Sequence, residues 1–129
     1  MLWEKINAAP GFNSWQRAPG YPRRMPSLTA HSKAVEIFVN DKITTVLTTP
    51  TTQPVTQWPV GSVIVKEGFS GSTRKIVAAM EKRDSGWFWA EYNGTGDTLF
   101  SGSSPSTCID CHDNRKDSSD WVYAFELPR

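Results

Sequence analysis

Regular alternation of apolar and polar side chains indicates that most of this chain forms β-strands. Residues 35–39 show the pattern most simply, with valine or isoleucine at every second position, which predicts a strand with one buried face. Further strand-like segments are residues 61–68, 74–82, 87–92, 98–100 and 121–125. Helix is the competing interpretation for residues 74–82, because alanine and methionine favour it. Connections of hairpin length between these segments, such as residues 84–86, predict an antiparallel sheet.

Three other segments depart from this pattern. Residues 1–30 hold four prolines and predict an irregular N-terminal arm without long elements. Residues 48–59 are rich in threonine and proline and predict a loop, whereas residues 42–47 predict a short helix. We therefore expect the arm to precede residues 31–129, within one compact domain overall. The expected fold class is α+β and mainly β, an antiparallel sheet of about five strands with short peripheral helices.

Composition and charge exclude several classes of partner. The chain has 129 residues, a formal net charge of +1 and 38% apolar residues, as expected for one globular domain. No basic run extends beyond Arg23 and Arg24, so we expect no nucleic-acid partner. No apolar run approaches the length that spans a bilayer, so we expect no membrane insertion. Six tryptophans, six phenylalanines and three tyrosines could wall a core or a large planar cofactor.

One short motif carries specific chemistry. Cys108, Cys111 and His112 form the pattern Cys-x-x-Cys-His, which includes both cysteines of the chain and one of its two histidines. This spacing is the attachment signature of covalent haem c. Each thiol can form a thioether with a haem vinyl group, and the imidazole can supply an axial ligand to iron. Because Ser104 and Pro105 suit the start of a helix, we expect the motif on a short C-terminal helix.

Two other kinds of site use cysteines at this spacing, namely a redox dithiol and a zinc site. A thioredoxin-like dithiol is expected near a βαβ pattern, which is not visible here. A structural zinc site needs four ligands, and a carboxylate would have to join the only other histidine, His31. Covalent haem is the favoured interpretation. Bacterial haem c is attached outside the cytoplasm, and residues 1–6 lack the apolar core of a signal peptide. We therefore expect a periplasmic or otherwise exported protein whose signal peptide has been removed; the alternative is a motif that never carries haem.

Several segments around the motif resemble the cytochrome P-460 family, which includes the cytochromes c′-β. The most specific feature is the order of a Gly-x-x-x-Val-Lys-Glu strand, here residues 61–67, and a late Cys-x-x-Cys-His. Further similar segments are residues 35–40, 80–82, 86–89 and 120–123. The resemblance runs from about His31 to the C-terminus.

This resemblance implies a five-coordinate haem c, held by thioethers to Cys108 and Cys111 and by His112 as the axial iron ligand. In the P-460 branch a strand lysine also bonds to the haem macrocycle, and Lys66 occupies the similar position. Such proteins are hydroxylamine-oxidising haem oxidoreductases, often homodimers, and their electrons pass to an electron-accepting redox protein. The c′-β branch shares the fold and binds nitric oxide without turnover. A solvated strand lysine is the alternative interpretation for Lys66.

Oxidation of hydroxylamine also requires a proton acceptor beside the substrate. The family's enzymes supply a carboxylate at a position that falls near Ala78, where this chain has none. Three glutamates could substitute, although each is also typical of a surface charge: Glu67, Glu81 and Glu91.

The sixth coordination position of the iron leaves a further alternative. Met80 or His31 could bind there and give a six-coordinate electron carrier, although a strand methionine is more often a core residue. Phe38 and Trp89 are candidates for an apolar wall of the site. Three functions therefore remain open: redox chemistry on hydroxylamine or related nitrogen oxides, nitric oxide binding without turnover, and electron transfer.

Overall fold

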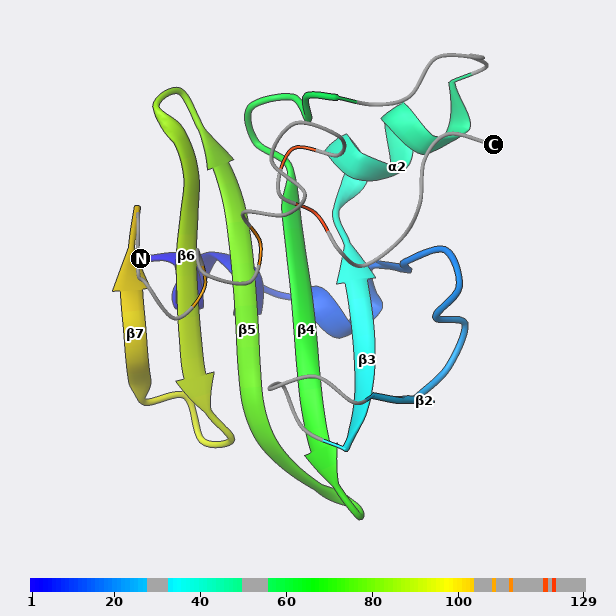
Figure 1. Cartoon of the computed structure of the whole chain (residues 1–129), viewed down its shortest axis with the longest axis vertical. Helices are drawn as coiled ribbons and strands as arrows, with labels where there is room; N and C mark the ends of the chain where they lie inside the picture. Colours follow the sequence, from blue (N-terminus) through cyan, green and yellow to red (C-terminus); the bar gives the residue numbers. More distant parts are fainter. Residues whose placement is uncertain are drawn as a thin grey trace.

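A seven-stranded antiparallel sheet forms the body of the protein (Figure 1). The computed structural model describes residues 1–27, 33–49 and 56–103, together with Cys108, His112, Asp120 and Val122. The strands are β1 (Gln16–Arg17), β2 (Met25–Pro26), β3 (Ala34–Val39), β4 (Val63–Ser70), β5 (Thr73–Arg83), β6 (Gly86–Asn93) and β7 (Thr98–Gly102). They lie in the order β1-β3-β4-β5-β6-β7, and β2 also pairs with β3. The mainly β fold expected from the sequence is confirmed.

The long central hairpins follow from alternation and from tight turns. β5 is a strand rather than the competing helix, because every second residue packs on the same side and both edges pair with neighbours. Gly71 joins β4 to β5 with a φ of +63°, and Gly86 starts β6 with a φ of +121°. Glycine adopts such angles without the steric cost that a Cβ atom brings, so both turns can stay short.

The two shortest strands were not expected from the sequence. β1 and β2 contain two residues each and both pair antiparallel with β3. Segments this short show no alternation, so only the pairing reveals them. The described part of the N-terminal arm therefore contributes strands to one edge of the sheet.

Each face of the sheet has its own apolar core. We call one the α1 face, because it packs against the helix α1 (Leu2–Asn7) and the 3₁₀ turn η1 (Phe12–Ser14). Its buried apolar residues are Leu2, Ile6, Phe12, Phe38, Val63, Val65, Val77, Ala79, Ala90 and Tyr92. We call the other the α2 face, after the helix α2 (Asp41–Thr48). Its buried apolar residues are Ala18, Val35, Ile37, Val39, Ile43, Trp58, Ile64, Met80, Trp87, Trp89 and Val122.

α2 is held at the end of β3 by one asparagine. The Asn40 side-chain oxygen accepts hydrogen bonds from Ile43 N, at 3.4 Å, and from Val63 N, at 3.1 Å. Its amide nitrogen donates to Gly61 O at 2.7 Å. One side chain thus caps α2 and joins it to the start of β4, which fixes where the helix covers the α2 face.

Other sequence expectations have different outcomes. The expected helix and strands between residues 33 and 103 are confirmed within one or two residues at most ends. Half of the expected loop at residues 48–59, namely residues 50–55, lies outside the described residues, as does the expected last strand at residues 121–125 apart from Val122. Trp58, at the end of that loop, is buried in the α2 face. Within the described residues, no helix is long and apolar enough to cross a membrane.

Candidate functional site

Cross-strand pairing arranges the side chains of the α2 face in rows. Directly opposed residues of antiparallel strands project to the same face of a sheet. Lys66 on β4 opposes Ala78 on β5, and Ala78 in turn opposes Glu91 on β6. We call these three residues the lysine row. Adjacent strands lie 4.7–4.9 Å apart, so the Cα atoms of Lys66 and Glu91 are separated by about 10 Å, with only a methyl side chain between them.

Two further rows follow at steps of two residues, or about 7 Å along each strand. The tryptophan row consists of Ile64, Met80 and Trp89, which oppose one another on β4, β5 and β6. The next row consists of Lys82 and Trp87, which oppose each other on β5 and β6. The three rows together form the candidate site.

His112 lies against the tryptophan row. Its imidazole meets the Trp89 ring edge-to-face, with 4.8 Å between the ring centroids and 63° between the ring planes. Trp89 is buried and His112 is half-buried. A fixed aromatic neighbour limits the orientations open to the imidazole, as an axial iron ligand requires.

Cys108 lies near the lysine row. The side chain is half-buried and packs against the apolar cluster of the α2 face. Burial, and secondarily the negative charge of nearby Glu91, raise the pKa of the Cys108 thiol to about 11. Before any haem is attached, this thiol is therefore protonated at neutral pH.

Glu91 is the carboxylate that the sequence could not single out. Burial raises its pKa above the ordinary value of 4.5, since a low-dielectric environment disfavours the charged form. A carboxylate with a raised pKa is a better proton acceptor near neutral pH than an exposed one. Glu91 is also the only one of the three candidate glutamates on the α2 face.

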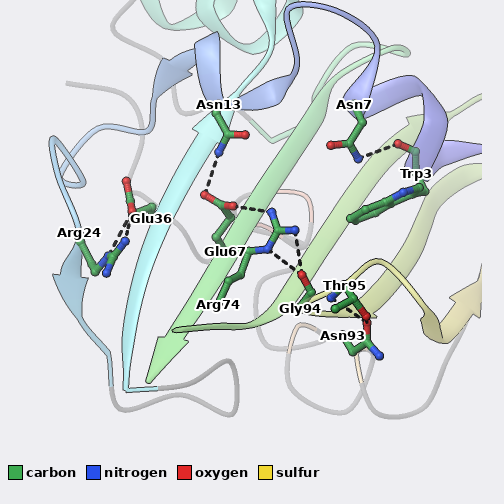
Figure 2. Close-up of polar contacts among 10 residues, drawn as sticks. All are labelled: Trp3, Asn7, Asn13, Arg24, Glu36, Glu67, Arg74, Asn93, Gly94 and Thr95. Carbon is green, nitrogen blue, oxygen red and sulfur yellow. Dashed lines mark hydrogen bonds and ion pairs between the residues drawn. The ribbon is translucent and has the colours of Figure 1, made fainter. Parts of the chain in front are cut away.

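The other two glutamates face the opposite side of the sheet and take part in ion pairs. Glu67 lies between Asn13 and Arg74 and accepts a hydrogen bond of 2.9 Å from each (Figure 2). Glu81 accepts hydrogen bonds from Lys5 and Arg83. Both carboxylates therefore serve to fix the α1 face, and neither can reach a substrate bound over the α2 face. Strand pairing decides on which face of the sheet each of the three glutamates lies, and residue spacing alone does not reveal that pairing.

Two other expected residues have definite places. Phe38 lies on the α1 face, where its ring meets Phe12 edge-on at 5.7 Å, so the expectation that it walls the site is wrong. Met80 is 9% exposed and packs within the tryptophan row, as an ordinary core methionine would. Cys111 and His31 lie outside the described residues, and the helical position of the motif as a whole stays a prediction.

Asp120 is a site residue that the sequence did not reveal as such. It is 4% exposed, and its carboxylate accepts hydrogen bonds from Trp58 N at 2.9 Å and from Lys82 Nζ at 2.5 Å. Its backbone carbonyl accepts a hydrogen bond of 2.8 Å from the indole nitrogen of Trp87. Carboxylates are rarely buried unless they are paired, and the hydrogen bonds from Trp58 and Lys82 provide that pairing for Asp120.

These residues fit a covalent haem. Cys108 and His112 both have helical backbone conformation. Both side chains approach the α2 face, where Ile64, Met80 and Trp89 offer apolar and aromatic surface. A thiol, an imidazole and apolar walls are the groups that a haem c site uses.

Comparison with known proteins agrees with the geometry. A search of curated proteins finds no match to this chain. The family model described as Cytochrome P460 matches residues 10–124, which include all seven described strands and all of the residues of the candidate site but not α1. The matched region begins earlier than the resemblance noted in the sequence and covers most of the N-terminal arm. The chain therefore belongs to the cytochrome P460 family.

Proposed function

We propose that this protein is a c-type haem protein that performs redox chemistry on hydroxylamine or related nitrogen oxides. The observation that carries the proposal is the lysine row. Lys66 and Glu91 share one face and one row with Ala78 between them, and Cys108 and His112 approach the same face. The residues proposed as cofactor anchor and axial ligand thus lie on the same face as Glu91, a half-buried carboxylate.

In this proposal Cys108 and Cys111 hold the haem by thioethers, and His112 is the axial iron ligand. When bound, the haem supplies an iron centre that accepts electrons from the substrate. Lys66 is placed to contact the cofactor from β4 and is the candidate for an additional covalent link to it. Lys66 is half-buried beside the apolar residues of the α2 face, where an apolar cofactor could cover its alkyl chain.

Glu91 is the proposed proton acceptor. Hydroxylamine loses protons as it loses electrons, so a base must lie beside it. Because its pKa is raised, Glu91 holds an accepted proton more readily near neutral pH than an exposed glutamate does. Ala78, the smallest member of the lysine row, leaves room beside the carboxylate for a small substrate.

A second function is favoured by the apolar character of the face. On β4 and β5, the side chains that flank Lys66 and Ala78 on this face are those of Ile64, Met80 and Ile76, none of which can exchange protons. Such a surface suits nitric oxide, a small neutral ligand, and nitric oxide binding without turnover is the alternative function.

One substitution distinguishes the two functions. In protein loaded with haem, Glu91→Gln removes the base and keeps the side-chain volume. We expect hydroxylamine-dependent reduction of an electron acceptor to fall about 100-fold or more, as for loss of a general base. Glu67→Gln is the control, since it makes the same chemical change on the opposite face, at a glutamate that is 5% exposed. Full turnover by the Glu91 variant would refute the assigned role. Nitric oxide binding by a wild-type protein that does not turn over hydroxylamine would support the alternative.

The proposal extends to partners and location. A turnover that removes electrons from the substrate requires an electron-accepting redox protein. Covalent haem attachment places the mature protein in the periplasm or another exported compartment, and pairing of two copies as a homodimer is part of the same proposal. Size-exclusion chromatography with light scattering measures directly whether the protein is a homodimer.

A further inference from the structure

We propose that Asp120, held in place by its ion pair with Lys82, is a positioning residue for His112. This inference rests on the proposed function in one respect, the assignment of His112 as the axial ligand. The structural part, that Asp120 fixes where His112 lies, stands on the contacts of the described residues alone.

Asp120 is buried and accepts three hydrogen bonds, and we call this group of contacts the latch. The Asp120 carboxylate binds the backbone nitrogen of Trp58 and the ammonium of Lys82, and the Asp120 carbonyl binds the Trp87 indole. The side chains of Lys82 and Asp120 are 11% and 5% exposed. Because a buried charge is strongly unfavourable once its partner is lost, the bonded arrangement is strongly preferred over a partly open one.

The backbone of Asp120 is adapted to this position. Its φ is +52°, the only positive value at a non-glycine residue among the described parts of the chain. Aspartate and asparagine enter this left-handed region more readily than most residues, yet it remains uncommon. Strain of this kind persists where surrounding contacts hold it, and here the contacts are those of the latch.

β6 also pairs with the chain that precedes the haem motif. Gly102, the last residue of β7, opposes Trp89 on β6, and Asp120 binds Trp87 two residues earlier on β6. Gly102 and Asp120, which precede and follow Cys108 and His112 in the chain, therefore both contact β6 at neighbouring positions.

The described residues of the motif and Asp120 follow the order of β6. Glu91, Trp89 and Trp87 project from the same face of β6 at steps of two residues. Cys108 lies near the first, His112 contacts the second and Asp120 binds the third. The order of these three residues thus matches the order along the strand. If Asp120 loses these hydrogen bonds, the contact of His112 with Trp89 loses the nearest fixed point that follows it among the described residues.

The test begins with the full-length chain produced without haem attachment. The chain has two histidines, so the ring protons of His112 can be assigned in NMR spectra by comparison with His112→Ala. We expect the Trp89 ring current to displace them in the wild type, and Asp120→Ala to move them to the values of a free imidazole. The backbone amide of Trp58 should exchange at least about tenfold faster in the variant, because it loses a charge-assisted hydrogen bond.

Glu67 supplies a matched control. Its carboxylate is also buried, at 5% exposed against 4% for Asp120, and also accepts two hydrogen bonds, but on the α1 face. Glu67→Ala should lower the stability of the protein and leave the His112 protons displaced. If Asp120→Ala leaves these protons unchanged, or if Glu67→Ala moves them equally, the inference is wrong.

Asp120→Asn guards against a variant that does not fold. Asparagine keeps the volume, tolerates the positive φ and can still accept the hydrogen bond from Trp58 N, but it cannot neutralise Lys82. We expect the His112 ring protons to move in the same direction as in Asp120→Ala, but by less. Asparagine spectra identical to those of the wild type would show that the ion pair does not act as a latch.

The haem-loaded protein gives a second readout. We expect Asp120→Ala to shift the iron–histidine stretching frequency in resonance Raman spectra, and Glu67→Ala to leave it unchanged. Equal frequencies in all three proteins would overturn the positioning role. If the wild type carries no haem, the proposed function fails, whereas the NMR comparison still decides whether Asp120 fixes His112.

Discussion

The contact between Trp89 and His112 can be measured as a coupling free energy. The two rings meet edge-to-face at 4.8 Å, a geometry worth about 0.5–1.5 kcal/mol beyond the area it buries. Trp89→Leu keeps an apolar side chain at a position that is 3% exposed, and we expect it to lower the free energy of unfolding by about 1–3 kcal/mol. His112→Ala should cost less, because His112 is only half-buried.

A double-mutant cycle isolates this contact. Urea unfolding of the wild type, both single variants and the double variant, all without haem, gives the coupling as the departure from additivity. We expect about 0.5–1.5 kcal/mol, with the double variant more stable than the sum of the two losses predicts. Coupling below about 0.3 kcal/mol would refute the placement of His112 on the tryptophan row.

A second cycle serves as the control. Trp3 lies on the α1 face, where its ring meets Tyr92 at 4.7 Å. Because Trp3 and Trp89 are on opposite faces of the sheet, their substitutions should add within about 0.5 kcal/mol. The Trp3–Tyr92 pair should itself show a coupling similar to that of Trp89 with His112. Both results are needed before a coupling at His112 can be assigned to ring contact.

Three further predictions concern other parts of the site. Burial raises the pKa of Glu91 above 4.5, so at Glu91 the folded chain holds a proton at pH values where the unfolded chain has lost it. The contribution of Glu91 to stability therefore falls as the pH rises from 4.5 through the pKa of the folded state. Glu91→Gln should abolish this fall in urea unfolding, and an unchanged pH dependence would contradict the prediction. Met80→Leu should leave the optical spectrum of the haem-loaded protein unchanged, whereas loss of a low-spin spectrum would identify Met80 as an iron ligand. Asn40→Ala should cost about 1–2 kcal/mol in urea unfolding, because it removes the cap of α2, and a cost below about 0.3 kcal/mol would contradict the importance of that cap.

Much of the fold could be predicted because alternation records burial directly. The residues of β3 to β6 alternate between two buried faces, and glycines mark the turns. The pairing of β1 and β2 with β3 could not be predicted, since two-residue strands leave no periodic pattern. The sheet therefore has more strands than the five or so that the sequence indicated.

The site shows a sharper division. The cysteine and histidine motif is local in sequence, so spacing alone identified it. Glu91 could not be separated from Glu67 and Glu81, because its role depends on which residue it opposes across two strand pairs. Asp120 was seen only as part of a similar segment, since its partners at Trp58 and Lys82 are distant in the chain. Motifs carried by neighbouring residues can be recognised in a sequence, whereas rows built by strand pairing require the register.

Covalent haem is the central claim, and the mass of the intact protein tests it most directly. The protein should be produced together with a c-type haem attachment system and measured under denaturing conditions by mass spectrometry. We expect the mass of the 14.4 kDa chain increased by that of one haem, and no increase when both Cys108 and Cys111 are replaced by serine. The mass of the bare chain in the wild type would contradict the account.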